Sequence, residues 1–326
     1  MMAGIRRKEP GMENVCFGVE INGINIRLIE YDYFRQMKSI AVIGAGTMGN
    51  GIAHVFALHG FSVSLIDVSA PQLEKALQTI QKNLGRQMEK GTITAGQQES
   101  SLKNIRTYSS VAEGVKDADL VVEAATENAE LKMNIFREID AAAPANCILA
   151  TNTSSISITK IASVTSRPGK VIGMHFMNPV PVMKLVEIIN GYATEKEVTE
   201  KIVGLAEKID KSPCVVNDYP GFIANRILMP MINEAIYSYY EGVAGIEAID
   251  TVMKLGMAHP MGPLQLADFI GLDVCLAILK VLHEGFGNPK YAPCPLLVNM
   301  VTAGKLGVKS GEGFYRYSAG GKVAVG

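Results

Sequence analysis

The fold of this chain is indicated most clearly by residues 38–67, KSIAVIGAGTMGNGIAHVFALHGFSVSLID. A β-branched run leads through a glycine-rich turn into a helical pattern, and a second β-branched run ends at Asp67. Strand, turn, helix and strand in this order are typical of the first unit of a doubly wound α/β sheet. The acid follows Gly46 by 21 residues, the spacing expected of a dinucleotide-binding unit.

The turn Gly44-Ala45-Gly46-Thr47-Met48-Gly49 has the pattern GxGxxG, and each glycine has a separate physical task. Gly44 permits the tight turn, Gly46 lets the backbone approach a pyrophosphate, and Gly49 allows close helix–strand packing. The helix that follows the turn offers free N–H groups and a positive dipole end to phosphate, and Thr47 and Met48 are expected among the cofactor-binding residues. We therefore predict a dinucleotide site here; the alternative is a flavodoxin-like packing turn without cofactor.

Asp67 is expected to accept hydrogen bonds from the adenosine ribose hydroxyls of that dinucleotide. The residues that follow, Val-Ser-Ala-Pro at 68–71, include no Arg or Lys that would hold a 2′-phosphate. The sequence therefore favours NAD over NADP.

The strand–helix alternation continues to residue 219 and then gives way to helical spacing alone. We expect an α/β fold, with an N-terminal Rossmann-type doubly wound sheet over 37–219 and a C-terminal all-α domain over 220–326. Further strands are predicted at 119–125, 147–153, 170–176, 184–189 and 214–217, and helices at 128–142, 195–209, 246–255, 263–283 and 294–303, with Pro230 a kink in the helix after Gly221. The predicted helices of residues 220–326 have strongly apolar faces. These faces could form only the core of that domain, but we favour the interpretation that part of their surface also buries a second subunit in a homodimer.

Composition excludes several classes of protein. The net charge is −1, so we expect no binding to nucleic acid or to anionic membranes, and no apolar run is long enough to span a membrane. The five cysteines form no CxxC, which favours reduced thiols in the cytoplasm over disulfides, zinc or another bound metal. Each cysteine is interpreted as a small apolar filler.

Residues 1–36 do not share the pattern of the rest. Their acidity argues against a mitochondrial transit peptide, and they have no apolar core of a signal peptide. Apolar alternation from Val15 to Ile21 and from Ile24 to Leu28, around Asn22-Gly23, predicts a hairpin with a type I′ turn. The rival interpretation is that Met37 is the natural start and the preceding residues are an upstream extension.

A candidate acid–base pair lies at His175, in the stretch HFMNP, and at Glu187, twelve residues later in the apolar run LVEII. A buried carboxylate needs a partner, and a carboxylate that orients a histidine can make it a general base. A core histidine is the ordinary alternative. His175, Ser154 and Glu127 all fall at or just past predicted strand ends, where doubly wound sheets bind ligands, and this favours the catalytic interpretation.

Six motifs together resemble the L-3-hydroxyacyl-CoA dehydrogenase family, including the short 3-hydroxybutyryl-CoA dehydrogenases, over about residues 37–318. They are VIGAGTMGNGIA at 42–53, EAATEN at 123–128, TNTSS at 151–155, GMHFMNPVPVMKLVEII at 173–189, DYPGFIANRIL at 218–228 and GVKSGEGFYRY at 307–317. The resemblance implies NAD-dependent oxidation of (S)-3-hydroxyacyl-CoA to 3-oxoacyl-CoA, and the reverse, by hydride transfer. The chain leaves no length for a fused hydratase domain, which favours short acyl chains.

The resemblance also implies roles for single residues. His175 is the general acid/base, Glu187 orients it, and Ser154 and Asn225 hydrogen-bond the reacting oxygen. These roles suit hydride transfer from an alcohol, which needs a base for the hydroxyl proton and donors to the product carbonyl. The alternatives are that Ser154 caps a helix and that Asn225 is a packing residue.

Along the cofactor, the resemblance implies contacts from Glu127, Lys132 and Asn178 near the ribose and nicotinamide, while Lys309 closes the site from the C-terminal segment. For the two lysines, the alternative is a solvated surface charge.

One feature of the sequence supports the acyl-CoA assignment independently of the family resemblance. A long polar helical hairpin is expected at about 71–103, and Arg86 and Lys90 lie four residues apart on one of its faces. They are candidates to hold the CoA phosphates, against the alternative of an ordinary charged face. Two other functions stay open: a dehydrogenase of a free 3-hydroxy acid, and a non-catalytic NAD-binding protein.

Overall fold

The computed structural model describes residues 17–21, 24–28, 37–318 and 321–325. Internal contacts separate residues 1–38 from residues 39–326. In the first unit, β1 (Phe17–Ile21) and β2 (Ile24–Leu28) pair antiparallel, with Ile21 opposite Ile24. The pairing of the predicted hairpin is therefore confirmed, while Val15 and the turn Asn22-Gly23 lie outside the described residues.

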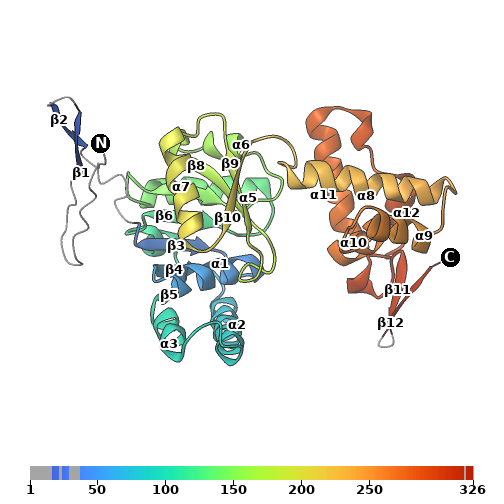
Figure 1. Ribbon diagram of the computed structural model, residues 1–326, viewed down its shortest axis with the longest axis horizontal. Coiled ribbons are helices and arrows are strands. Elements are labelled where there is room, and N and C mark those ends of the chain that lie inside the picture. The colour runs from blue at the N-terminus through green and yellow to red at the C-terminus, as the bar shows by residue number, and fades with distance from the viewer. Residues whose placement is uncertain (1–16, 22–23, 29–36, 319–320, 326) are drawn as a thin grey trace. The chain divides into compact units, whose positions relative to one another are not determined.

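The second unit contains an eight-stranded sheet in the order β10-β9-β8-β7-β6-β3-β4-β5 (Figure 1). Neighbouring strands run parallel, except that β8 and β9 are antiparallel. The strands are β3 (Ser39–Ile43), β4 (Ser62–Ile66), β5 (Ile105–Tyr108), β6 (Leu120–Glu123), β7 (Ile148–Thr151), β8 (Val171–Phe176), β9 (Leu185–Asn190) and β10 (Ser212–Asn217). This confirms the predicted α/β fold. Strand β5 was not predicted, because its sequence IRTY has no apolar run.

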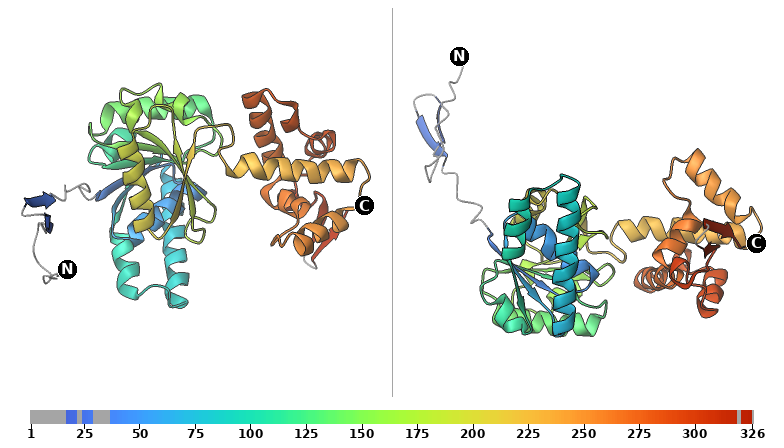
Figure 2. Two further views of the ribbon diagram at one scale, coloured as in Figure 1. Left: turned by 45° about the horizontal axis from the view of Figure 1, so that its top comes forward. Right: turned by 90° about the horizontal axis from the view of Figure 1, so that it is seen from below.

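Helices alternate with these strands and supply the other half of the core. Phe136 and Ile139 of α5 are buried against Val121 of β6 and Leu149 of β7. The helices are α1 (Thr47–Leu58), α2 (Ala70–Glu89), α3 (Ala95–Lys103), α4 (Val111–Val115), α5 (Ala129–Ala142), α6 (Ile158–Ala162) and α7 (Lys196–Lys208). Helices α2 and α3 lie side by side as the predicted helical hairpin (Figure 2).

The rest of the unit is mainly helical and has its own apolar core, which includes Met229, Ile232, Leu264 and Leu279. Its helices are α8 (Ala224–Tyr240), α9 (Ile246–Thr251), α10 (Pro263–Ile270), α11 (Leu272–Phe286) and α12 (Pro295–Thr302). The prediction of one helix over 263–283 is wrong, because Gly271 adopts φ 104° and separates two helices. A β-hairpin of β11 (Tyr315–Ser318) and β12 (Gly321–Ala324) was not predicted.

The cysteines divide into two groups. Cys147, Cys275 and Cys294 are buried, and burial raises the pKa of Cys147 and of Cys275 to about 12, so both stay protonated thiols. Cys214 is exposed on the edge strand β10, so the filler interpretation is wrong there, and Cys16 lies outside the described residues. In the described part of the chain, no helix combines the length and apolarity needed to cross a membrane.

Candidate active site

His175 and Glu187 face each other across two neighbouring strands. Strands β8 and β9 pair in a register that sets His175 directly opposite Glu187. The imidazole Nδ1 lies 2.8 Å from Glu187 Oε2, and both residues are buried. The twelve-residue separation in the sequence thus becomes a contact because the strands are antiparallel.

The second oxygen of Glu187 is held by backbone N–H groups at the start of α8. Ala224 and Ile223 donate to Oε1 at 3.0 and 3.3 Å. Burial acts to raise the pKa of Glu187, but the hydrogen bonds from His175 and Ala224 outweigh it and hold that pKa below its usual range. Glu187 is therefore an ionised partner for His175 at neutral pH.

The other ring nitrogen of His175 contacts Ser154, which follows strand β7. Ser154 Oγ lies 3.0 Å from Nε2, and the Ser154 carbonyl accepts a 3.3 Å hydrogen bond from the Asn225 side-chain amide. With the Nδ1 proton directed at Glu187, Nε2 is left as the acceptor. The structure therefore brings together all four residues predicted for catalysis.

Glu127 organises the loop that carries Ser154. Its Oε1 accepts hydrogen bonds from the Thr153 hydroxyl at 2.5 Å, from the Ser154 N–H at 3.0 Å and from the N–H and hydroxyl of Ser155 at 3.1 and 3.0 Å. One carboxylate oxygen thus fixes three successive residues of the TNTSS motif.

Lys132 is buried below this loop, so the alternative of a solvated surface charge is wrong for it. Its ammonium group bonds Glu123 at 2.7 Å and the Ala125 carbonyl at 3.1 Å, and lies 3.5 Å from Glu127. Glu123, itself fully buried, was missed in the sequence although it opens the EAATEN motif. An acid at the end of an apolar strand, nine residues before a lysine on the next helix, was the available signal.

The glycine turn has the shape that a dinucleotide requires. Gly44 adopts φ 94°, and a Cβ there would lie 2.7 Å from the Ala124 carbonyl oxygen. A Cβ at Gly49 would collide with the Gly44 carbonyl, whereas one at Gly46 would meet nothing within 4 Å. Gly46 precedes α1 without a side-chain cap, so the first N–H groups of the helix, beginning at Thr47, are available to phosphate.

Asp67 stands at the carboxyl end of β4 beside this turn. Its two carboxylate oxygens accept backbone hydrogen bonds from Ala45 at 2.8 Å and from Ser69 at 2.9 Å. These bonds tie the acid to the glycine turn and fix its orientation.

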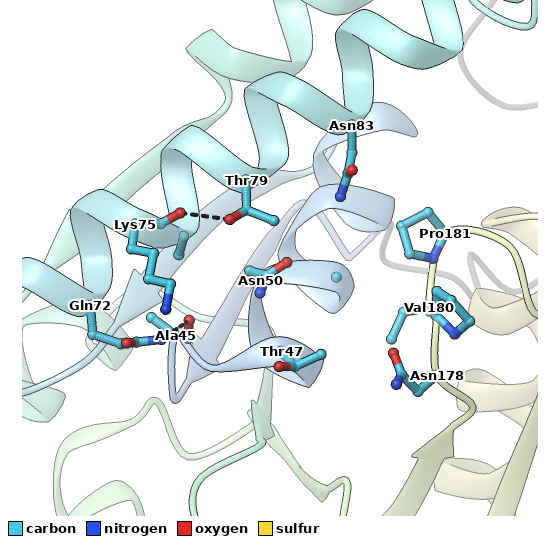
Figure 3. Close-up of a pocket in the computed structure, with 13 residues that line it drawn as sticks. Ala45, Thr47, Asn50, Gln72, Lys75, Thr79, Asn83, Asn178, Val180 and Pro181 are labelled. Carbon is cyan, nitrogen blue, oxygen red and sulfur yellow. Dashed lines mark hydrogen bonds between the residues drawn. The ribbon is translucent and has the colours of Figure 1, made fainter. Parts of the chain in front are cut away.

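A pocket of about 230 Å³ lies between the glycine turn, helix α2 and the segment after β8 (Figure 3). Polar side chains from α1 and α2 line it together with Asn178, which was predicted. The polar lining residues that the sequence reading missed are Asn50, Gln72, Lys75, Thr79 and Asn83. The last three are spaced four apart on α2, a helix-face pattern that could have identified them.

The remaining predicted residues lie elsewhere. Arg86 and Lys90 are exposed at the end of α2, beyond the residues that line the pocket. Lys309 forms an ion pair with Asp273 of α11, so the structure places its ammonium group among the C-terminal helices.

Comparisons with known proteins agree with this geometry. The family description "3-hydroxyacyl-CoA dehydrogenase, NAD binding domain" matches residues 39–219, which confirms NAD as the cofactor, and "3-hydroxyacyl-CoA dehydrogenase, C-terminal domain" matches 221–317. The chain is 55% identical to the probable 3-hydroxybutyryl-CoA dehydrogenase of Bacillus subtilis over 86% of its own length and 98% of that protein. It is 53% identical to the 3-hydroxybutyryl-CoA dehydrogenase of Bradyrhizobium diazoefficiens, with coverage of 86% and 96%. The crystal structure of (S)-3-hydroxybutyryl-CoA dehydrogenase from Ralstonia eutropha aligns with a TM-score of 0.85 at 48% identity, over 86% of this chain and 99% of that one.

Proposed function

This chain belongs to the 3-hydroxyacyl-CoA dehydrogenase family, and on that premise we propose that it interconverts (S)-3-hydroxybutyryl-CoA and its 3-oxo product with NAD. The observation that carries the proposal is the continuous chain of contacts from Glu187 through His175 to Ser154. It provides a base for a hydroxyl proton and a donor for a carbonyl oxygen at one point.

In the oxidation, His175 Nε2 takes the proton from the substrate hydroxyl. The resulting imidazolium keeps its Nδ1–H on Glu187, whose negative charge stabilises it. Ser154 and Asn225 hydrogen-bond the oxygen as it becomes a carbonyl, and His175 returns the proton in the reverse direction. NAD, when bound, supplies the acceptor for the hydride that leaves C3.

The residues around the glycine turn hold the cofactor. Gly44, Gly46, Thr47, Met48 and Gly49 receive the pyrophosphate at the N-terminus of α1. Asp67 accepts from the adenosine ribose, while Glu127 and Asn178 lie along the ribose and nicotinamide end. Lys132 acts on this end through Glu127, 3.5 Å away. Lys309 closes the site from the C-terminal segment once its ammonium group exchanges its ion pair with Asp273 for the cofactor.

We also infer that helix α2 binds the phosphates of the acyl-CoA. The face of α2 that lines the pocket through Lys75, Thr79 and Asn83 continues at helical spacing to Arg86 and Lys90. Replacement of both Arg86 and Lys90 by Ala should raise the Michaelis constant for acyl-CoA several-fold while that for NADH stays within a factor of about two. Equal effects on the two constants would remove these residues from the site.

The domain organisation is part of the same proposal. Residues 37–219 form the NAD-binding domain, and residues 220–326 form the helical domain that contributes to the substrate site and to a homodimer. Exposed apolar side chains in the helical part, among them Ile227, Leu255 and Phe269, support an interface there. A monomer mass in light scattering at micromolar concentration would refute the dimer.

Substrate choice tests the function directly. Purified protein should oxidise NADH with acetoacetyl-CoA far faster than with free acetoacetate. Faster turnover of free acetoacetate would favour a dehydrogenase of free hydroxy acids. Binding of NADH without any turnover of acetoacetyl-CoA would indicate a non-catalytic NAD-binding protein.

A further inference from the structure

Lys211 is a buried lysine that none of the proposed catalytic steps uses. It lies between α7 and β10 and is only 7% exposed. Its ammonium group donates to two backbone carbonyls, those of Val180 at 2.5 Å and Met183 at 2.7 Å. Charged hydrogen bonds of this kind are stronger than those between neutral groups, so the contact fixes the segment that carries both carbonyls.

That segment joins β8 to β9 and forms one wall of the pocket beside the glycine turn. Asn178, Val180 and Pro181 all line the pocket (Figure 3). On the other side of the segment, Gly51 of α1 approaches so closely that a Cβ on it would lie 2.9 Å from Val180 Cβ. Val180 is therefore held between Lys211 and the helix whose N-terminus faces the dinucleotide.

We propose that Lys211 is a positioning residue for the dinucleotide, clamping the β8–β9 connection in the place where it completes the pocket. The inference rests on the proposed function, because it takes the glycine-turn side of this pocket, at Ala45, Thr47 and Asn178, to be part of the NAD site. It concerns the affinity for the dinucleotide rather than the proton transfer at His175.

The charges around Lys211 make the clamp sensitive to alkaline pH. Burial and the nearby charge of Lys184 lower the pKa of Lys211 to about 8, against the opposing effect of Asp210. His54 of α1 also faces Lys211. Burial is the main cause that lowers the pKa of His54, and the charges of Lys211 and His59 lower it further, while the hydrogen bond to Gln87 opposes them. His54 is therefore uncharged at neutral pH. The ammonium charge is thus present below pH 8 and is lost as pH rises through it.

The test is NADH binding, followed by fluorescence at pH 7.0 and at pH 9.5. Wild-type protein should bind NADH several-fold more weakly at the higher pH. Lys211→Met, which keeps the length of the side chain but not its charge, should bind about tenfold more weakly at pH 7.0 and show no further loss at pH 9.5. In Lys211→Met, the Michaelis constant for NADH should rise more than kcat falls. Lys208→Met, at an exposed lysine on the last turn of α7, is the matched control and should behave as wild type.

Several results would overturn the proposal. The first is a folded Lys211→Met protein that binds NADH with the affinity and the pH dependence of wild type. A lower melting temperature alone in that variant would mean that Lys211 stabilises the fold but does not position the dinucleotide. If Lys211→Met does not fold, Lys211→Arg decides: its charge persists at pH 9.5, so the alkaline loss of affinity should disappear, and an unchanged loss refutes the clamp. A wild-type protein that does not bind NADH at all would instead refute the proposed function.

Discussion

Two buried pairs of an acidic and a basic side chain lie at the carboxyl edge of the sheet. They differ in whether the basic side chain keeps a nitrogen that is not bound to the acid or to its loop. Glu123 and Lys132 form a closed pair, because the ammonium group contacts Glu123, the Ala125 carbonyl and Glu127. In the other pair, Glu187 binds one nitrogen of His175, and the second nitrogen faces Ser154. Burial and ion pairing are common to both.

A buried ion pair is therefore not by itself a sign of catalysis. The Lys132 ammonium group lies 2.7 Å from Glu123 and 3.5 Å from Glu127, so this pair serves to shape the Glu127 loop. Histidine changes charge near neutral pH, and its second nitrogen gives it a place to exchange a proton. Variants of the two pairs should therefore fail in different ways.

The largest expected effect is on turnover at the open pair. His175→Gln should lower kcat by roughly 10²–10⁴-fold, because it removes the proposed acid–base group, while NADH binding stays near wild type. Steady-state kinetics with acetoacetyl-CoA and NADH fluorescence measure the two properties. Turnover close to wild type would end the assignment of His175.

For the pair of Glu123 and Lys132, we expect a loss of folding stability and not of catalysis. Lys132→Met leaves Glu123 buried without its partner and should lower the free energy of unfolding by about 3–5 kcal/mol in urea titrations. The matched control is Lys103→Met, which breaks an exposed ion pair with Glu99 and should cost less than about 1 kcal/mol. Equal losses in the two variants would contradict the role assigned to burial.

A smaller effect on turnover should follow from Glu187→Gln. The variant keeps the shape of the side chain but removes the charge that stabilises the imidazolium, so kcat should fall by about 10²-fold. Glu197→Gln, at a surface ion pair with Lys201, is the control and should leave kcat unchanged. A kcat within twofold of wild type in Glu187→Gln would mean that His175 needs no orienting acid.

The smallest effect is a pH dependence of stability. Because the folded state lowers the pKa of Glu187, this carboxylate stabilises the fold above its unfolded pKa, near 4.5, and the contribution is lost as pH falls through the folded pKa. Wild type should therefore lose more unfolding free energy than Glu187→Gln between pH 6 and pH 3. Parallel urea titrations at these two pH values measure it, and identical acid losses would show that Glu187 is not stabilised as an anion.

Much of the fold was predictable because the decisive patterns are local. The β-branched runs predicted β3 and β4 within one residue, and the pattern after the GxGxxG turn predicted that α1 lies between them. Errors came where local patterns were weak or misleading: strand β5 has no apolar run, and Gly271 interrupts an apolar helical pattern with a positive φ. The β11–β12 hairpin was missed at the chain end.

The residues of the candidate site and the pairing of His175 with Glu187 were predicted, but most of the other contacts in the site were not. His175, Glu187, Ser154 and Asn225 were identified from motifs, and the structure brings them together. The partnership of Lys132 with Glu123 was missed, because the depth of a side chain depends on how α5 packs on the sheet.

Local sequence patterns alone specified the dinucleotide unit and the strand–helix alternation before residue 220, because both follow from spacing along short segments. Sequence motifs also identified His175, Glu187, Ser154 and Asn225. The antiparallel register that sets His175 opposite Glu187, and the two N–H groups at the start of α8 that hold Glu187, follow only from the folded chain. It alone also joined Lys211 to the pocket wall. These contacts connect segments between 12 and 37 residues apart, and their geometry follows from strand pairing and packing, which no local period encodes.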